Sequence, residues 1–156
     1  MANTKYQEVF DSFLNKVEDD DWYSSYQDEL ESYELDWTGM LHTAVAMFKF
    51  PRFNTNLNDI DKEFCCKLSN DEIEILAILM KQEWLDRIIH SWEQAKLLYD
   101  ERDFSPANML AQLIKAQEHN DKVARSLQKT YSRAIIDEEG YKKPFDYKIF
   151  GSAHNV

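Results

Sequence analysis

Residues 69–90 read SNDEIEILAILMKQEWLDRIIH, and this stretch decides the fold. Ser69 and Glu72 have the spacing of a capping box, in which each side chain bonds the backbone amide of the other residue and so starts a helix. Asp71 and Glu74 add negative charge in the first turn, where the helix dipole favours it. The spacing therefore predicts a helix that begins at Ser69.

Apolar residues on more than one face of this helix indicate that other helices enclose it. One stripe at helical spacing comprises Ile73, Leu76, Ala77, Met80, Trp84 and Ile88. A second stripe comprises Ile75, Ile78, Leu79, Leu85 and Ile89. We therefore predict an all-α protein, a small helical bundle around a central buried helix. The apolar spacing continues beyond His90 and favours a helix that runs as far as Tyr99 over a break near His90.

The composition of the whole chain agrees with a helical fold. It has 156 residues, which suits one domain with a real core, and only three glycines and three prolines. No apolar run is long enough to cross a membrane, so we expect no membrane contact. Cys65 and Cys66 are adjacent and poorly placed for a disulfide, which suggests two part-buried thiols in a reducing compartment.

Three further helices are expected before residue 69. The first covers residues 4–18, with Thr4 as its cap and apolar residues at helical spacing on one face. Four successive acids at 18–21 then favour a turn, and a short helix follows at 22–35. A third helix covers 37–48 and ends before Pro51, because the residue before a proline avoids the helical region.

Residues 50–68 lack a helical period and are rich in turn-forming Asn and Asp. They predict a long connection with a short strand or helical turn. Connections of this length in a compact domain are often functional. We therefore regard this segment as a candidate contact surface, with four apolar residues as its candidate contacts: Phe53, Leu57, Ile60 and Phe64.

The last long helix is expected from Pro106 to about Arg133, with Ser105 as its cap. Its second half has a thin apolar stripe and several cations, which favours a segment that projects from the core or packs against another subunit. Its candidate contact residues are Arg125, Lys129 and Arg133. If the bundle leaves part of the central helix uncovered, the exposed remainder is expected around Trp84, Ile88 and Trp92.

The chain changes character after Gly140. We predict a helical domain over residues 1–140 and an extended C-terminal arm over 141–156. The arm alternates aromatic and β-branched residues with polar ones. Two interpretations stay open: the arm orders on a partner by strand addition, or it folds back over its own bundle. Its candidate contact residues are Tyr141, Phe145, Tyr147, Ile149 and Phe150.

Charge is distributed unevenly along the chain. The net charge is −11, and the first 36 residues hold 11 acids and two lysines. From Ser105 onward, 8 basic residues outnumber 6 acids. A solvated acidic face is one interpretation. The other is a subunit whose acidic part meets the basic part of a neighbour, since complementary fields speed and orient association.

No catalytic, cofactor-binding or metal-binding motif is present. The four histidines stand apart in the sequence, and none forms a zinc pattern. The acids at 18–21 lack the spacing and glycine of a calcium loop. Glu83 and Asp86 share a helix face with His90, so an acid–base cluster is geometrically possible there. We expect no enzymatic activity, no cofactor and no metal.

Four runs of sequence carry a resemblance to a known class: MLHTAVAMFKFPRF (40–53), LSNDEIEILAILMKQEWLDRII (68–89), DFSPANML (103–110) and LQKTYSRA (127–134). Together they resemble small virion proteins of tailed bacteriophages from the neck, or head-to-tail connector. The resemblance spans roughly residues 37–133 and is one of pattern, without a short defining signature. It implies a helical adaptor, or head-completion, protein without catalytic residues.

The resemblance also implies partners and a location. Proteins of this class form a ring beneath the portal, extend the DNA channel and dock the tail. The expected partners are therefore further copies of this chain, the portal, and tail or neck proteins, with DNA passing by without sequence-specific binding. The expected location is the virion. The alternatives are a small acidic helical interaction or regulatory module, and an enzyme with an unrecognised carboxylate–histidine site.

Overall fold

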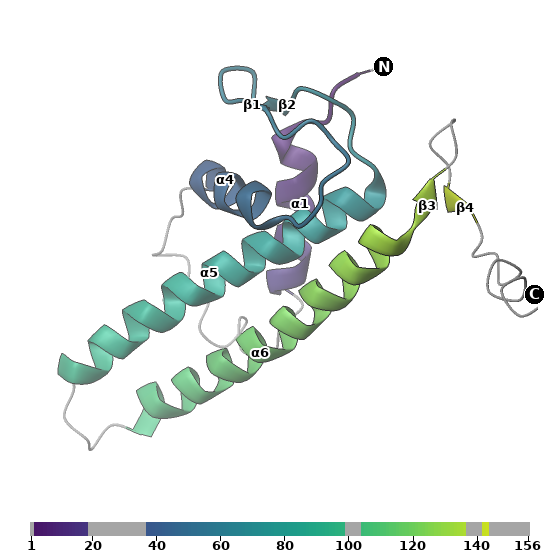
Figure 1. Ribbon diagram of the computed structural model, residues 1–156. Helices are drawn as coiled ribbons and strands as arrows, with labels where there is room; N and C mark the ends of the chain where they lie inside the picture. Colours follow the sequence, from purple (N-terminus) through teal and green to yellow (C-terminus); the bar gives the residue numbers. More distant parts are fainter. Residues whose placement is uncertain (1, 19–36, 99–103, 137–141, 144–156) are drawn as a thin grey trace, which may run out of the picture.

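The computed structural model describes residues 2–18, 37–98, 104–136 and 142–143, and these residues are mostly helical (Figure 1). The helices are α1 (Tyr6–Glu18), α4 (Trp37–Met47), α5 (Asn70–Leu98) and α6 (Phe104–Arg133). The strands are β1 (Leu57–Asn58), β2 (Glu63–Phe64), β3 (Ile135–Ile136) and β4 (Lys142–Lys143). β1 pairs with β2, and β3 with β4, both antiparallel. The predicted helical class is confirmed.

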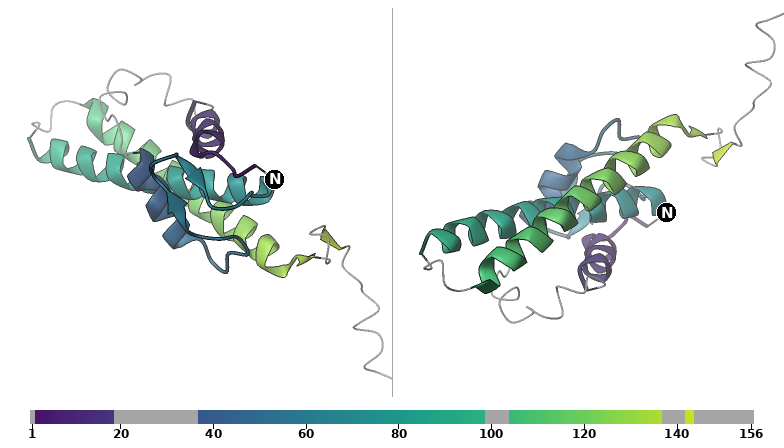
Figure 2. Two further views of the ribbon diagram at one scale, coloured as in Figure 1. Left: turned by 90° about the horizontal axis from the view of Figure 1, so that it is seen from above. Right: turned by 90° about the horizontal axis from the view of Figure 1, so that it is seen from below.

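Helix α5 contacts each of the other described helices. It runs alongside α6 in the opposite direction, and α1 crosses it steeply (Figures 1 and 2). Every residue of its two predicted stripes is buried except Ile73, which is half-buried. Trp84 and Ile88 are therefore covered within the chain, whereas Trp92 is half-buried, so the condition for an exposed remainder is not met at Trp84 and Ile88. The rings of Phe13 of α1 and Trp84 pack in a T-shaped arrangement, with their centroids 6.1 Å apart.

The predicted start and length of this helix are both confirmed. The backbone N–H of Ser69 donates to Oε2 of Glu72 at 2.7 Å, and the N–H of Glu72 donates to Oγ of Ser69 at 3.3 Å. These bonds satisfy two of the amides that have no partner inside the helix. The helix then continues without a break to Leu98.

Thr4 does not cap α1 as expected. The helix begins at Tyr6, and the N–H of Lys5 donates to Oε1 of Glu8 at 3.1 Å. Oγ1 of Thr4 instead accepts from the N–H of Leu68 at 2.8 Å, across 64 positions of sequence. Because a long-range partner competes successfully for this hydroxyl, Thr4 joins the N-terminal segment to the residues that lead into α5.

Two expectations for α6 are wrong. The helix begins at Phe104, so Ser105 lies in its first turn instead of capping it. Its second half does not project, because it packs along α5 through residues that include Asn120, Ala124 and Tyr131. The amide of Asn120 donates to the carbonyl of Ile78 at 3.1 Å. Because its hydrogen bond is satisfied, the buried amide of Asn120 takes the place of an apolar side chain in the contact between α5 and α6.

The connection between α4 and α5 contains the short hairpin β1–β2. Oδ1 of Asn58 accepts from the N–H groups of Ile60 and Asp61, both at 3.2 Å, and so shapes the turn. Phe64 of β2 is fully buried against the rings of Tyr6 and Phe53. The prediction of Phe64 as a contact residue is therefore wrong, because its side chain belongs to the core.

Two sequence predictions fall largely outside the described residues. These are the turn and short helix at 18–36, and the arm from Tyr141 onward. The exception is β4, whose Lys142 and Lys143 pair with Ile136 and Ile135. This pairing crosses the predicted boundary at residue 140.

We expect Asp86→Asn to raise the Tm at pH 7 by a few degrees at most. Burial raises the pKa of Asp86, and the negative charges of Glu83 and Asp121 add to the shift, while a hydrogen bond from Gln117 opposes it. A carboxyl group with a raised pKa contributes stability at low pH and loses it as pH rises through that pKa. Asparagine stays neutral and keeps an acceptor for Gln117.

Thermal unfolding at pH 7 and at about pH 4 checks this expectation. The gain should shrink at the lower pH, because a larger fraction of the Asp86 carboxyl group of the wild type is then protonated. Because both proteins carry the same other carboxyl groups, the difference between them isolates position 86. A variant that is less stable than the wild type at pH 7 contradicts the expectation.

Candidate functional site

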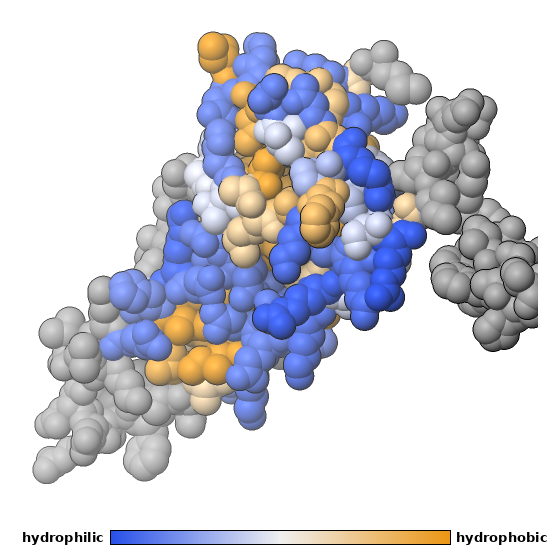
Figure 3. Space-filling view, in the orientation of Figure 1, coloured by the Kyte–Doolittle hydropathy of each residue, from blue (hydrophilic) through white to orange (hydrophobic). Residues whose placement is uncertain are grey.

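A shallow groove of about 200 Å³ lies between the segment after α4 and the last turns of α6. We call it the basic groove, and its lining residues are Lys49, Phe50, Arg125, Gln128, Lys129 and Ser132. Figure 3 shows hydrophobic patches among strongly hydrophilic side chains on the face of the molecule that is seen in Figure 1. The groove combines cations with an aromatic ring.

The segment that carries Phe50 is fixed to α6 on both sides. Before it, the N–H of Lys49 donates to Oε1 of Gln128 at 2.7 Å. After it, the N–H of Arg52 donates to Oη of Tyr131 at 2.9 Å, and Nη1 of Arg52 donates to the Tyr131 carbonyl at 2.8 Å. The Arg52 guanidinium also stacks 3.8 Å from the centre of the Tyr131 ring. Hydrogen bonds on either side of Phe50 therefore join the two walls of the groove, the segment after α4 and α6.

Phe50 has an unusual conformation and an unusual exposure. Its φ angle is 54°, in the left-handed region that bulky residues avoid, and its side chain is 78% exposed. The hydrogen bonds of Lys49 and Arg52 to α6 hold this backbone conformation. Because the Phe50 ring is exposed, no burial of apolar area offsets the strain of the Phe50 backbone. Such an outlier motivates a functional hypothesis. Here it suggests that the ring is displayed for a partner.

The charge around Phe50 is positive in a chain whose net charge is −11. Lys49, Arg125 and Lys129 are all exposed at the groove. Nε of Arg125 pairs with Asp121 at 3.0 Å, but its side chain remains 75% exposed. An exposed pair of this kind contributes little to stability. The local field instead favours an acidic partner.

A buried tyrosine, Tyr131, joins the segment after α4 to the start of α5. Oη of Tyr131 donates to Oε1 of Glu72 at 2.8 Å, and Glu72 also closes the capping box with Ser69. Burial raises the pKa of Tyr131 to about 12, so its hydroxyl stays neutral at physiological pH. The anchor of Arg52 on α6 and the cap of the central helix thus share one hydrogen-bonded unit through Tyr131.

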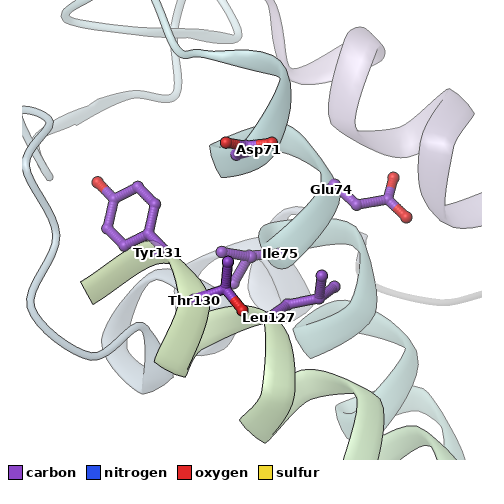
Figure 4. A pocket seen from close by; sticks show the side chains of 6 residues that line it. All are labelled: Asp71, Glu74, Ile75, Leu127, Thr130 and Tyr131. Atoms are coloured by element: carbon purple, nitrogen blue, oxygen red, sulfur yellow. The ribbon is translucent and has the colours of Figure 1, made fainter. Parts of the chain in front are cut away.

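A second, smaller cavity of about 60 Å³ lies between the first turns of α5 and the last turns of α6 (Figure 4). Its lining residues are Asp71, Glu74, Ile75, Leu127, Thr130 and Tyr131. The carboxylate of Glu74 points away from it toward α1, where it pairs with Lys16 at 2.6 Å. Its volume is far below that of sites for small organic ligands.

Both carboxylates of the suggested acid–base cluster on α5 have other partners. Glu83 pairs with Arg87 at 2.9 Å, and Asp86 accepts from Gln117. Instead, the structure brings together His42 and Asp59, which are far apart in sequence.

Nε2 of His42 lies 2.9 Å from Oδ2 of Asp59, and the hydroxyl of Tyr6 donates to Oδ1 of Asp59 at 2.7 Å. The bonds from Tyr6 and His42 lower the pKa of Asp59. His42 and Asp59 are both about half exposed, and the three residues tie the hairpin to α1 and α4. We assign this cluster a structural role.

The structure separates the other candidate contact residues by exposure. Arg125 and Lys129 line the groove, and Arg133 is exposed near it in sequence. Ile60 is 93% exposed at the hairpin turn. Phe53, Leu57 and Trp92 are half-buried against the core. The five arm residues lie outside the described part of the chain: Tyr141, Phe145, Tyr147, Ile149 and Phe150.

Sequence reasoning missed Lys49 and Phe50. The available signal was the alternation of aromatic and basic residues in FKFPR (48–52). The run places the first aromatic side chain, Phe48, in the core and the second, Phe50, at the surface.

No family model, curated protein or solved structure matches this chain. Among the described residues, no group of three or more His, Cys, Asp or Glu side chains is arranged to hold a metal ion. Cys65 is exposed and Cys66 is half-buried, and both are free thiols. In the same part of the chain, no helix has the length and apolar character needed to span a membrane.

Proposed function

We propose that this chain is a structural protein of a tailed bacteriophage that assembles with itself into a ring in the neck, between the portal and the tail. It acts as a small helical bundle around α5, with the arm 141–156 reaching a neighbour or the portal. The proposal assigns it no catalytic step. The resemblance over residues 37–133 supports the class, and the basic groove supports assembly.

The single observation that carries the proposal is the basic groove. Its cations and its strained, exposed Phe50 form a surface whose construction the stability of the monomer does not explain. An exposed aromatic ring and an arginine, here Phe50 and Arg125, are residue types that are enriched at protein interfaces. A partner with acidic character fits it best.

Unequal charge along one chain suits a ring. A ring requires a head-to-tail contact, in which one surface of each copy meets a different surface of the next. The chain has a strongly acidic first part and a basic groove near the end of α6. Identical copies that carry both surfaces can repeat the same contact until the ring closes.

The net charge of −11 also suits a channel for DNA. Binding of a protein to the DNA backbone depends on the number of phosphates that its cations neutralise. An acidic wall repels phosphate, so DNA passes without sticking. Cations that a neighbouring copy covers are not available to DNA.

Native mass spectrometry and negative-stain imaging of the full chain test this function. We expect a closed oligomer whose mass is a whole multiple of 18.5 kDa. Removal of residues 141–156 should keep the helical circular dichroism signal and abolish assembly. A matched deletion of 144–156 retains the β3–β4 pair and separates loss of the arm from loss of that pair.

A chain that stays monomeric at every concentration contradicts the ring and favours the acidic interaction module instead. A chain that assembles normally without residues 141–156 contradicts only the role of the arm. Loss of assembly in the longer deletion alone would assign the contact to the β3–β4 pair.

A further inference from the structure

We propose that the acidic segment 19–36 of one copy binds in the basic groove of the next copy. This inference rests on the ring assembly proposed above and names the two surfaces that make its contact. One surface is the groove, whose residues the structure describes. The other is a peptide segment, which is identified by its chemistry.

The groove is built to receive a ligand without rearrangement. Its two walls are joined by the hydrogen bonds of Lys49 and Arg52 to α6, so binding does not have to order them. A surface that is already in its bound conformation loses less entropy on association. Phe50 and the exposed cations Arg125 and Lys129 then offer an apolar contact between positive charges.

Segment 19–36 complements the groove in two ways. It holds eight acids and no Lys or Arg, so its carboxylates match the groove cations. It also holds four aromatic residues, Trp22, Tyr23, Tyr26 and Tyr33. Aromatic rings pack favourably on a ring such as that of Phe50 and on guanidinium groups such as that of Arg125.

The ring proposed above places the groove on a neighbouring copy. The segment follows Glu18, the last residue of α1. In both views of Figure 2, α1 lies on the opposite side of α5 from the connection that follows α4 and carries Phe50. The segment ends just before Trp37, where α4 begins, so both of its ends are attached to helices of its own copy. The chain with four charge reversals described below separates binding to its own groove from binding to the groove of a neighbour.

Charge reversal on each surface tests the contact. The groove variant is Arg125→Glu with Lys129→Glu, and the segment variant is Asp20→Lys with Asp21→Lys. Each alone should weaken assembly at least tenfold, measured by sedimentation at several protein concentrations. A mixture of the two should recover part of the lost assembly, because the lysines introduced at positions 20 and 21 of one variant then meet the glutamates introduced at positions 125 and 129 of the other. Rising salt should weaken assembly of the wild type.

A chain that carries all four reversals distinguishes binding of the segment within one copy from binding between copies. If that chain behaves as the wild type but the mixture fails to assemble, the segment binds its own groove and the proposal is wrong. The control is Lys67→Glu with Lys115→Glu, which reverses two exposed charges that do not line the groove. The control should assemble as the wild type does.

Phe50→Asn tests the displayed ring without damaging the fold. Asparagine tolerates the left-handed region better than phenylalanine, so the Tm should stay the same or rise. Assembly should weaken several-fold, because the apolar contact is lost. Loss of both stability and assembly would show that Phe50 supports the fold, and it would remove this support for the contact.

The outcomes separate the two proposals. A wild type that assembles, with reversal variants that assemble equally well, overturns the groove contact and leaves the ring. A wild type that never leaves the monomer overturns both. Binding of a DNA duplex by the wild type, abolished by Arg125→Glu with Lys129→Glu, assigns the groove to phosphate and overturns the acidic segment as its ligand.

Discussion

Ile88→Ala is expected to lower the free energy of unfolding by about 3 kcal/mol, and the Tm by roughly 10 °C. Ile88 lies on α5 and is fully buried. Truncation removes apolar area and leaves a cavity that the packed helices around α5 fill only in part. Urea unfolding followed by circular dichroism at low protein concentration measures the change.

The matched control is Ile114→Ala on α6. Ile114 is 37% exposed, so the same chemical change removes less buried area and should cost under about 1 kcal/mol. Equal losses at the two positions would mean that α5 is not more deeply enclosed than α6. Equal losses would also make Ile88 a candidate contact with another subunit, as expected from the sequence for an uncovered part of α5.

Glu72→Ala is expected to cost about 2 to 4 kcal/mol. The carboxylate of Glu72 accepts from the N–H of Ser69 and from the hydroxyl of Tyr131, and the residue is 8% exposed. Its removal opens the capping box and leaves a buried hydroxyl without this acceptor. Thermal and urea unfolding measure the loss.

Two comparisons separate these contributions. Glu8→Ala removes a similar bond at the exposed start of α1, to the N–H of Lys5, and should cost under about 1 kcal/mol. A double-mutant cycle of Glu72→Ala with Tyr131→Phe should show a coupling energy of about 1 kcal/mol or more. Strictly additive losses would contradict the hydrogen-bonded unit that joins the cap of α5 to Tyr131 and the segment after α4.

The elements that could be predicted are those whose signals are local. The capping box at Ser69, the two stripes of α5 and its continuation to Leu98 follow from side-chain chemistry and helical spacing alone. The start of α1 was less accurate, because Thr4 finds its partner at Leu68, and sequence spacing contains no information about such a distant bond.

The candidate site was predicted only in part. Arg125 and Lys129 are cations on an exposed helix face, and their spacing in α6 was visible in the sequence. Lys49 and Phe50 join them because Gln128 and Tyr131, which are 79 positions away from Lys49 and Arg52, hold the connection against α6. Residues that line one groove from two distant segments show no pattern in a linear chain.

By itself, the sequence determined the helical class, the identity of the central helix and the imbalance of charge, because capping, helical period and composition are local properties. Tertiary structure alone decided that Phe64 enters the core and that Phe50 does not. It also decided that the second half of α6 packs along α5. The physical reason is that burial and long-range hydrogen bonds depend on which segments meet, and that choice is made by the whole chain.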